Sequence, residues 1–219
     1  MTIQEQANAI LHWFQQYQPD PKPELNYENP FQLLVAVVLS AQCTDKRVNQ
    51  ITPALFKRYP SPREMSLSSQ DEIFPFVKSC SYPNNKSKHL LLLSKILMET
   101  FKGEVPSTVE ELETLPGVGH KTANVLVSVI HNAPALAVDT HVFRVAARLG
   151  LTKNAKTPLE TEKQLLKLIP TEKVARAHHW FILHGRYVCT AKKPNCKECG
   201  ISGFCAFFDY GKPAINKTI

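Results

Sequence analysis

The sequence has no hydrophobic run long enough to cross a membrane. Its longest apolar stretch, LLVAVVL at residues 33–39, is much shorter than the roughly 20 residues of a membrane-spanning helix. The N-terminus also lacks the basic segment followed by an apolar core that is typical of a secretory signal peptide. We therefore expect a cytoplasmic protein with no membrane partner.

Strand-like alternation of apolar and polar residues is equally scarce, and no internal repeat or low-complexity tract is visible. Helical spacing of apolar residues dominates instead. The segment FQLLVAVVLSAQ, residues 31–42, suits a strand or a helix by periodicity, but its length and the helical continuation TDKRVNQITPALF favour a central buried helix that ends in polar residues. Residues 157–160 and 107–110 both have the form of a helix N-terminal cap. We predict an all-α protein.

Acidic residues are in the minority. The chain has 26 lysines and arginines against 19 aspartates and glutamates, which gives a net charge of +7. This balance suits a polyanionic partner such as nucleic acid, although positive charge also serves solubility.

Disulfides are not expected among the six cysteines, because the cytoplasm keeps thiols reduced. Cys43 and Cys80 stand apart, whereas four cysteines gather near the C-terminus with the spacing C-x6-C-x2-C-x5-C: Cys189, Cys196, Cys199 and Cys205. This run contains one CxxC pair, unlike the two separated pairs usual for structural zinc. The spacing indicates a metal centre and favours an iron–sulfur cluster only slightly over zinc.

A glycine turn precedes a lysine at residues 115–129, LPGVGHKTANVLVSV. Gly117 and Gly119 separate two predicted helices, so backbone N–H groups at the start of the second helix are available to bind an anion. This pattern is typical of a helix-hairpin-helix contact with a DNA backbone. A nucleotide-binding P-loop is the alternative, but His120 separates Gly119 from Lys121 and the preceding segment is helical.

Lys121 has two possible roles. A phosphate contact is the usual role for a lysine in a basic protein, but the first turn of a helix is an unfavourable place for an ammonium. We expect the helix dipole and partial burial to favour the neutral amine, which is a nucleophile able to form a Schiff base. Asp139, in the apolar stretch AVDTHV, suits either a helix N-cap or a catalytic carboxylate, and the two roles are compatible.

With these residues in hand, the chain resembles the endonuclease III family of base-excision-repair DNA glycosylases, most closely its bacterial pyrimidine-specific branch. The motifs LLVAVVLSAQCTD, LPGVGHKTANV, AVDTHVFRV, HHWFILHGRYVC and the cysteine spacing occur in order over nearly the whole chain. The resemblance implies an enzyme that flips a damaged pyrimidine out of double-stranded DNA, excises it and cleaves the abasic site. A monomer associated with the nucleoid is expected.

The resemblance also assigns roles to residues. Lys121 is implied to attack C1′ of the flipped nucleotide, and Asp139 to accept a proton or stabilise positive charge on the sugar. The resulting imine permits β-elimination. Related adenine glycosylases lack this lysine. Gln42 matches the residue that fills the gap left by the flipped base; without the resemblance, an ordinary polar residue at a helix C-terminus is the better interpretation.

The four cysteines are implied by the same resemblance to hold a 4Fe-4S cluster with a structural role. The cluster is expected to pin the loop TAKKPN, so that Lys192 and Lys193, with Arg186, form a basic patch facing DNA phosphates. A solvated charge run is the alternative for these residues.

Two positions depart from the family pattern. His120 replaces the arginine that usually precedes the catalytic lysine, which removes a permanent charge. The change affects either a phosphate contact or a supporting contact, and not the chemistry. Tyr82 falls where many relatives carry a leucine wedge; it suits either stacking on an exposed base or simple packing.

We expect two helical lobes with the DNA cleft between them. The helix-hairpin-helix domain is predicted at residues 24–133, and the cluster domain at residues 1–23 together with 134–219. A non-catalytic DNA-binding or redox-sensing iron–sulfur protein remains an alternative, as does an adenine- or mismatch-directed glycosylase, which Tyr82 would suit.

Overall fold

The computed structural model describes residues 1–209, and within this range the chain forms helices, turns and loops but no strand. The all-α prediction is therefore confirmed. No helix in this range is long and apolar enough to cross a membrane.

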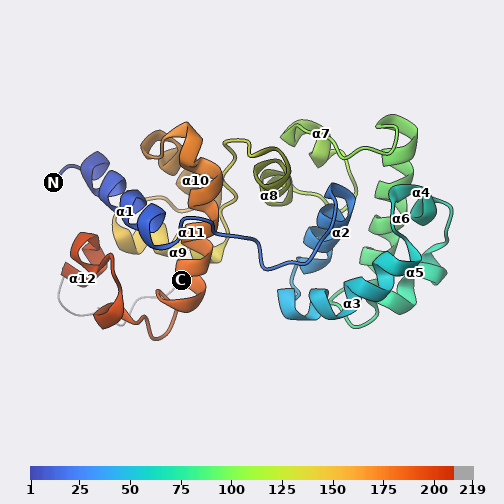
Figure 1. The fold of residues 1–219 in the computed structure, drawn as a ribbon, viewed down its shortest axis with the longest axis horizontal. Coiled ribbons are helices and arrows are strands. Elements are labelled where there is room, and N and C mark those ends of the chain that lie inside the picture. Colours follow the sequence, from blue (N-terminus) through green and yellow to red (C-terminus); the bar gives the residue numbers. More distant parts are fainter. Residues whose placement is uncertain (210–219) are drawn as a thin grey trace. The chain divides into compact units, whose positions relative to one another are not determined.

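The α-helices (Figure 1) are α1 Ile3–Tyr17, α2 Pro30–Ser40, α3 Asp45–Arg58, α4 Pro62–Ser66, α5 Gln70–Val77, α6 Pro83–Thr100, α7 Val109–Glu113, α8 His120–His131, α9 Thr140–Leu149, α10 Pro158–Leu168, α11 Val174–Tyr187 and α12 Ala206–Asp209. Single 3-10 turns are η1 Thr171–Lys173, η2 Cys196–Glu198 and η3 Ser202–Phe204.

Both predicted cap sequences lie at the start of a helix. One of the two helices begins one residue later than predicted. Thr157 caps α10 in a capping box with Glu160, and a proline follows at the first helical position. At α7 the cap is Thr108, whose side chain accepts a hydrogen bond from the backbone of Glu111, and not the preceding serine. Either hydroxyl is a good cap by type, so the sequence pattern leaves the choice between neighbours open.

The chain divides into two compact units. One unit comprises Pro23–Asn132. Its centre is α2, which begins at the cap Asn29 and is buried at every position from Phe31 to Leu39. Helices α3, α6 and α8 all contact α2. The interpretation of this apolar run as a central helix rather than a strand is confirmed. A helix that is apolar on all sides is buried on all sides.

The other unit comprises Met1–Lys22 and Ala133–Ile219. Helix α1 packs against α10, and α9 packs against α11. The ring of Phe14 stacks on Trp180 with centroids 5.8 Å apart, and the Trp180 indole donates a hydrogen bond to the Gln18 carbonyl at 2.7 Å. These contacts fix the N-terminal helix to the C-terminal part of the chain. Residues 210–219 of the second predicted domain lie outside the described residues.

Candidate functional site

The turn between α7 and α8 forms the predicted hairpin. Its two glycines differ in whether the local structure requires glycine. Gly117 has φ +84°, and a Cβ there would lie 2.9 Å from Nδ1 of His89. Gly119 is the N-cap of α8 and has an extended backbone. A Cβ at Gly119 would meet nothing within 4 Å. The fold therefore requires glycine at position 117, whereas position 119 is open to an approaching ligand.

The start of α8 has the properties of an anion site. Among the described residues, the backbone N–H groups of Gly119, Lys121 and Thr122 have no acceptor within the chain. No acidic side chain lies in the first turn of α8. Unpaired N–H groups and the positive end of a helix dipole together attract phosphate.

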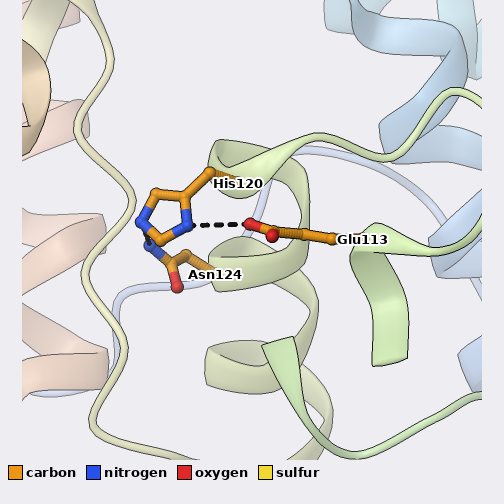
Figure 2. A network of polar contacts seen from close by, with 3 residues as sticks. All are labelled: Glu113, His120 and Asn124. Carbon is orange, nitrogen blue, oxygen red and sulfur yellow. Dashed lines mark hydrogen bonds and ion pairs between the residues drawn. The ribbon is translucent and has the colours of Figure 1, made fainter. Parts of the chain in front are cut away.

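His120 is held by two neighbouring side chains, as Figure 2 shows. Its Nδ1 lies 2.9 Å from Oε1 of Glu113, and its Nε2 lies 3.2 Å from the side-chain nitrogen of Asn124. When the Asn124 amide donates to Nε2, the ring proton is on Nδ1 and is donated to Glu113. Both His120 and Glu113 are substantially exposed, so an incoming phosphate competes with Glu113 for the imidazole.

Lys121 is the second residue of α8 and its side chain is exposed. The predicted partial burial is therefore wrong: the first turn of α8 faces outward, and the buried positions of the helix begin at Ala123. The exposed amine is accessible to an approaching macromolecule.

Asp139 is the N-cap of α9 and is partly buried. Its Oδ1 accepts hydrogen bonds from the backbone N–H groups of His141 and Val142, both at 2.8 Å. The capping role that the sequence allowed is confirmed. Oδ2 takes no part in the cap, so the carboxylate retains one oxygen for other contacts. Asp139 and Lys121 belong to different units.

Gln42 and Tyr82 lie on two segments that are neighbours in the structure. Both have φ 54°, which is uncommon for residues other than glycine and is frequent at functional sites. Ser81 Oγ donates a hydrogen bond of 2.6 Å to the Gln42 carbonyl. Gln42 is exposed, and the Tyr82 side chain is 62% exposed. Simple packing therefore does not explain Tyr82.

Lys86 was not singled out by its sequence, because lysines in a polar segment are normally solvated. Here it is buried, with 5% of its surface exposed. Its ammonium donates hydrogen bonds of 2.8 Å to the carbonyls of Leu39 and Ala41 at the end of α2. Burial lowers the pKa of Lys86. Since the last carbonyls of a helix lack partners within the helix, Lys86 acts as a C-terminal cap and fastens α6 to the segment that carries Gln42.

The four C-terminal cysteines line one cavity of the second unit. The cavity has a volume of about 330 Å³ including its open mouth, and it is also lined by residues from the end of α9 to α12, among them His184. No three histidine, cysteine, aspartate or glutamate side chains within residues 1–209 are arranged to hold a single metal ion. The four cysteines therefore share one site.

Two of the thiols in this cavity disfavour ionisation, and Arg148 donates a hydrogen bond of 3.4 Å to the sulfur of a third, Cys189. Burial raises the pKa of Cys199 and of Cys205, and charge repulsion from the other cysteines adds to both shifts. His184 Nε2 lies 3.7 Å from Cys199 Sγ, and burial lowers the pKa of His184 to about 4. His184 is therefore a neutral neighbour and supplies no positive charge at neutral pH.

The loop between the first two cysteines has an anchor that the sequence did not reveal. Arg148 on α9 donates hydrogen bonds of 2.8 Å to the Thr190 carbonyl and 2.9 Å to the Ala191 carbonyl. Lys192 and Lys193 follow these anchored carbonyls and are exposed. Arg186 lies in the last turn of α11 and is partly exposed. An arginine forty residues away in the sequence has no local signal that would predict this contact.

The chain matches known proteins over most of its length. Residues 35–171 match the family described as HhH-GPD superfamily base excision DNA repair protein. Endonuclease III of Rickettsia felis is 45% identical over 96% of this chain and 98% of its own length. Endonuclease III of Bacillus subtilis is 46% identical over 85% of each chain.

A solved structure of a trapped endonuclease III–DNA covalent intermediate has 42% identity and a TM-score of 0.87, and the match covers 94% of this chain and 97% of that chain. The family match, the two relatives and the solved structure all agree with the hairpin and the helical fold described above. The chain therefore belongs to the endonuclease III family, within the HhH-GPD superfamily of base excision DNA repair proteins.

Proposed function

We propose that this chain, a DNA glycosylase and abasic-site lyase of base excision repair, excises oxidised pyrimidines from double-stranded DNA and uses Lys121 as its nucleophile. The observation that carries the proposal is the position of Lys121, exposed at the start of α8 directly after the hairpin glycines. An amine at this position lies beside the N–H groups that suit a DNA phosphate.

In the proposed reaction, the neutral amine of Lys121 attacks C1′ of the flipped nucleotide, and the bond from C1′ to the base breaks. Opening of the sugar ring converts the adduct to an imine. The imine acidifies a C2′ proton, whose removal expels the 3′-phosphate by β-elimination. Strand cleavage thus follows excision in the same site.

Asp139 is assigned the carboxylate role. Its Oδ1 is used by the cap of α9, which holds the side chain in one orientation. The other oxygen is then available to accept the proton of the attacking amine or to stabilise positive charge on the sugar. A capped and partly buried carboxylate is well suited to this role because its position is fixed before substrate binds.

DNA contacts are assigned to residues of both units. In the first unit, the hairpin positions Gly117, Gly119 and His120 are proposed to bind the backbone. Gln42 is proposed to fill the gap left by the flipped base, and Tyr82 to wedge beside it. Their exposure and shared left-handed backbone support these roles. In the second unit, the proposed phosphate contacts are Lys192, Lys193 and Arg186. The protein is proposed to act as a monomer.

We further propose that the four C-terminal cysteines hold a 4Fe-4S cluster. The donor set fits, since the four thiols line a common cavity and cysteine thiolates are the usual ligands of such clusters. When bound, the cluster supplies a structural crosslink.

The substrate assignment is tested by comparing two duplexes. One carries thymine glycol and the other carries adenine opposite 8-oxoguanine. We expect release of thymine glycol with strand cleavage, and no release of adenine. Adenine excision would favour the mismatch-directed alternative, and salt-sensitive binding without any cleavage would favour a non-catalytic DNA-binding protein.

A further inference from the structure

Two cysteines that are far apart in sequence lie near each other in the first unit. Cys43 lies between α2 and α3, and Cys80 lies between α5 and α6. Both are free thiols. Burial and a side-chain hydrogen bond with Cys43 raise the pKa of Cys80 to about 11. The residue after Cys80 and the residue before Cys43 are joined by a hydrogen bond, so the two thiols are neighbours, which is the first requirement for a disulfide.

Further hydrogen bonds fix the approach of the two segments. Ser81 Oγ donates to the Gln42 carbonyl at 2.6 Å, directly beside the thiol pair. Lys86 donates to the carbonyls of Leu39 and Ala41. The two segments are thus held together by hydrogen bonds on either side of the cysteines. Their approach does not depend on the cysteines themselves.

The two thiols differ in access. Cys43 is partly exposed, whereas Cys80 is only 4% exposed. The Lys86 ammonium interacts electrostatically with both sulfur atoms, and Arg47 also lies near Cys80. A partly exposed cysteine beside a positive charge is the reactive type, and an adjacent buried thiol suits a resolving role.

We propose that Cys43 and Cys80 are a redox modification site that forms a reversible disulfide when the protein meets hydrogen peroxide. The Cys43 thiolate attacks one peroxide oxygen, the O–O bond breaks, and hydroxide leaves to give a sulfenic acid. The Cys80 sulfur then attacks the Cys43 sulfur, and the S–OH bond breaks. Its oxygen takes the Cys80 proton and leaves as water. Peroxide is reduced to two waters as two thiols are oxidised to one disulfide.

The disulfide has a consequence for DNA, which rests on the proposed function. An S–S bond of about 2.05 Å is shorter than any contact between two thiols, so its formation draws the segments together. Gln42 precedes Cys43, and Tyr82 follows Cys80 by two residues, each with φ 54°. The shift therefore moves the two side chains assigned to the space beside a flipped base. Oxidation weakens binding to lesion-containing duplex.

The modification is tested on the purified holoprotein without reference to activity. The protein is treated with hydrogen peroxide, remaining thiols are alkylated, and tryptic peptides are analysed by mass spectrometry. We expect the peptide with Cys43 to be joined to the peptide with Cys80, and dithiothreitol to release them. Cys80→Ala and Cys43→Ser each abolish the joined species. Separate alkylation of both cysteines after peroxide treatment overturns the proposal.

The effect on DNA is measured by fluorescence anisotropy with a duplex that contains a stable abasic-site analogue. We expect the oxidised protein to bind about tenfold more weakly than the reduced protein, with recovery in dithiothreitol. Cys80→Ala treated with the same peroxide is the matched control for damage to the C-terminal cysteines, and its affinity is expected to stay constant. A crosslinked protein with unchanged affinity overturns the regulatory half of the proposal.

These outcomes separate the inference from the proposed function. If the reduced protein neither binds nor cleaves lesion-containing duplex, the proposed function fails while the mapped disulfide still stands. If the reduced protein is active but no disulfide forms, the inference alone fails.

Discussion

The carboxylate of Asp139 accepts a hydrogen bond of 2.8 Å from the backbone N–H of Val142. The residue assigned to catalysis is therefore also the N-cap of α9. Substitutions at this position can change two properties, the negative charge and the helix cap. The two effects can be separated because asparagine caps a helix as well as aspartate does.

Asp139→Asn is expected to reduce base excision by about 10²–10⁴-fold, because the charge is lost while the cap is kept. Its thermal stability and DNA affinity are expected to stay near those of the unchanged protein. Asp139→Ala is the matched variant and is expected to lose about 0.5–2 kcal/mol of folding free energy in addition. Single-turnover excision and chemical denaturation measure the two effects. Normal excision by Asp139→Asn would leave Asp139 with the capping role alone.

Gly117 and Gly119 are expected to respond differently to alanine. Gly117→Ala places a Cβ at φ +84° and against His89, so it is expected to cost about 1–2 kcal/mol of folding free energy or more. The Cβ added by Gly119→Ala lies within 4 Å of no other atom of the protein. It is expected to fold nearly normally but to bind DNA about tenfold more weakly, because the Cβ obstructs a charge-assisted bond from the backbone to phosphate. Equal loss of stability in both variants would contradict this division.

His120→Arg is expected to tighten DNA binding and to steepen its salt dependence. Arginine restores a permanent charge at the start of α8, and each phosphate contact adds about 0.9 to the slope of log K against log salt. Glu113→Gln is the companion variant, because it removes the carboxylate that holds His120. Affinities at several salt concentrations measure the slope. An unchanged slope in His120→Arg would show that position 120 does not face a phosphate.

The cysteine centre is expected to contain about four irons and four sulfides per chain. Cys199→Ser is expected to lower the iron content and to weaken DNA binding, because the loop bearing Lys192 and Lys193 loses one of its supports. The Arg148 contacts remain in this variant, so partial binding is expected. Elemental analysis and absorption spectroscopy measure the centre. Stoichiometric zinc would contradict the cluster assignment.

Features set by local sequence were predictable. The buried helix α2 follows from an unbroken apolar run, and the start of α10 follows from a cap, a proline and a glutamate at fixed spacing. The gathering of the four cysteines in one cavity agrees with their short separations in the chain.

Features set by contacts between distant segments were not predictable. The burial of Lys86 depends on where α6 meets the end of α2. The proximity of Cys43 to Cys80 depends on the same approach of two distant segments. Arg148 reaches a loop that has no sequence relation to it. Lys121 was expected to be partly buried because its helix is apolar, but the apolar face of α8 begins two residues later, at Ala123. Sequence periodicity shows which residues share one face of a helix. It does not show which part of that face is buried by other segments.

The central claim is that Lys121 forms the covalent bond to DNA, and borohydride trapping tests it most directly. The protein is incubated with an abasic duplex and borohydride, and the reduced adduct is resolved on a denaturing gel. We expect an adduct with the unchanged protein and with Lys163→Gln, which alters an exposed lysine on α10. Lys121→Gln is expected to bind the duplex but give no adduct. An undiminished adduct from Lys121→Gln would contradict the account.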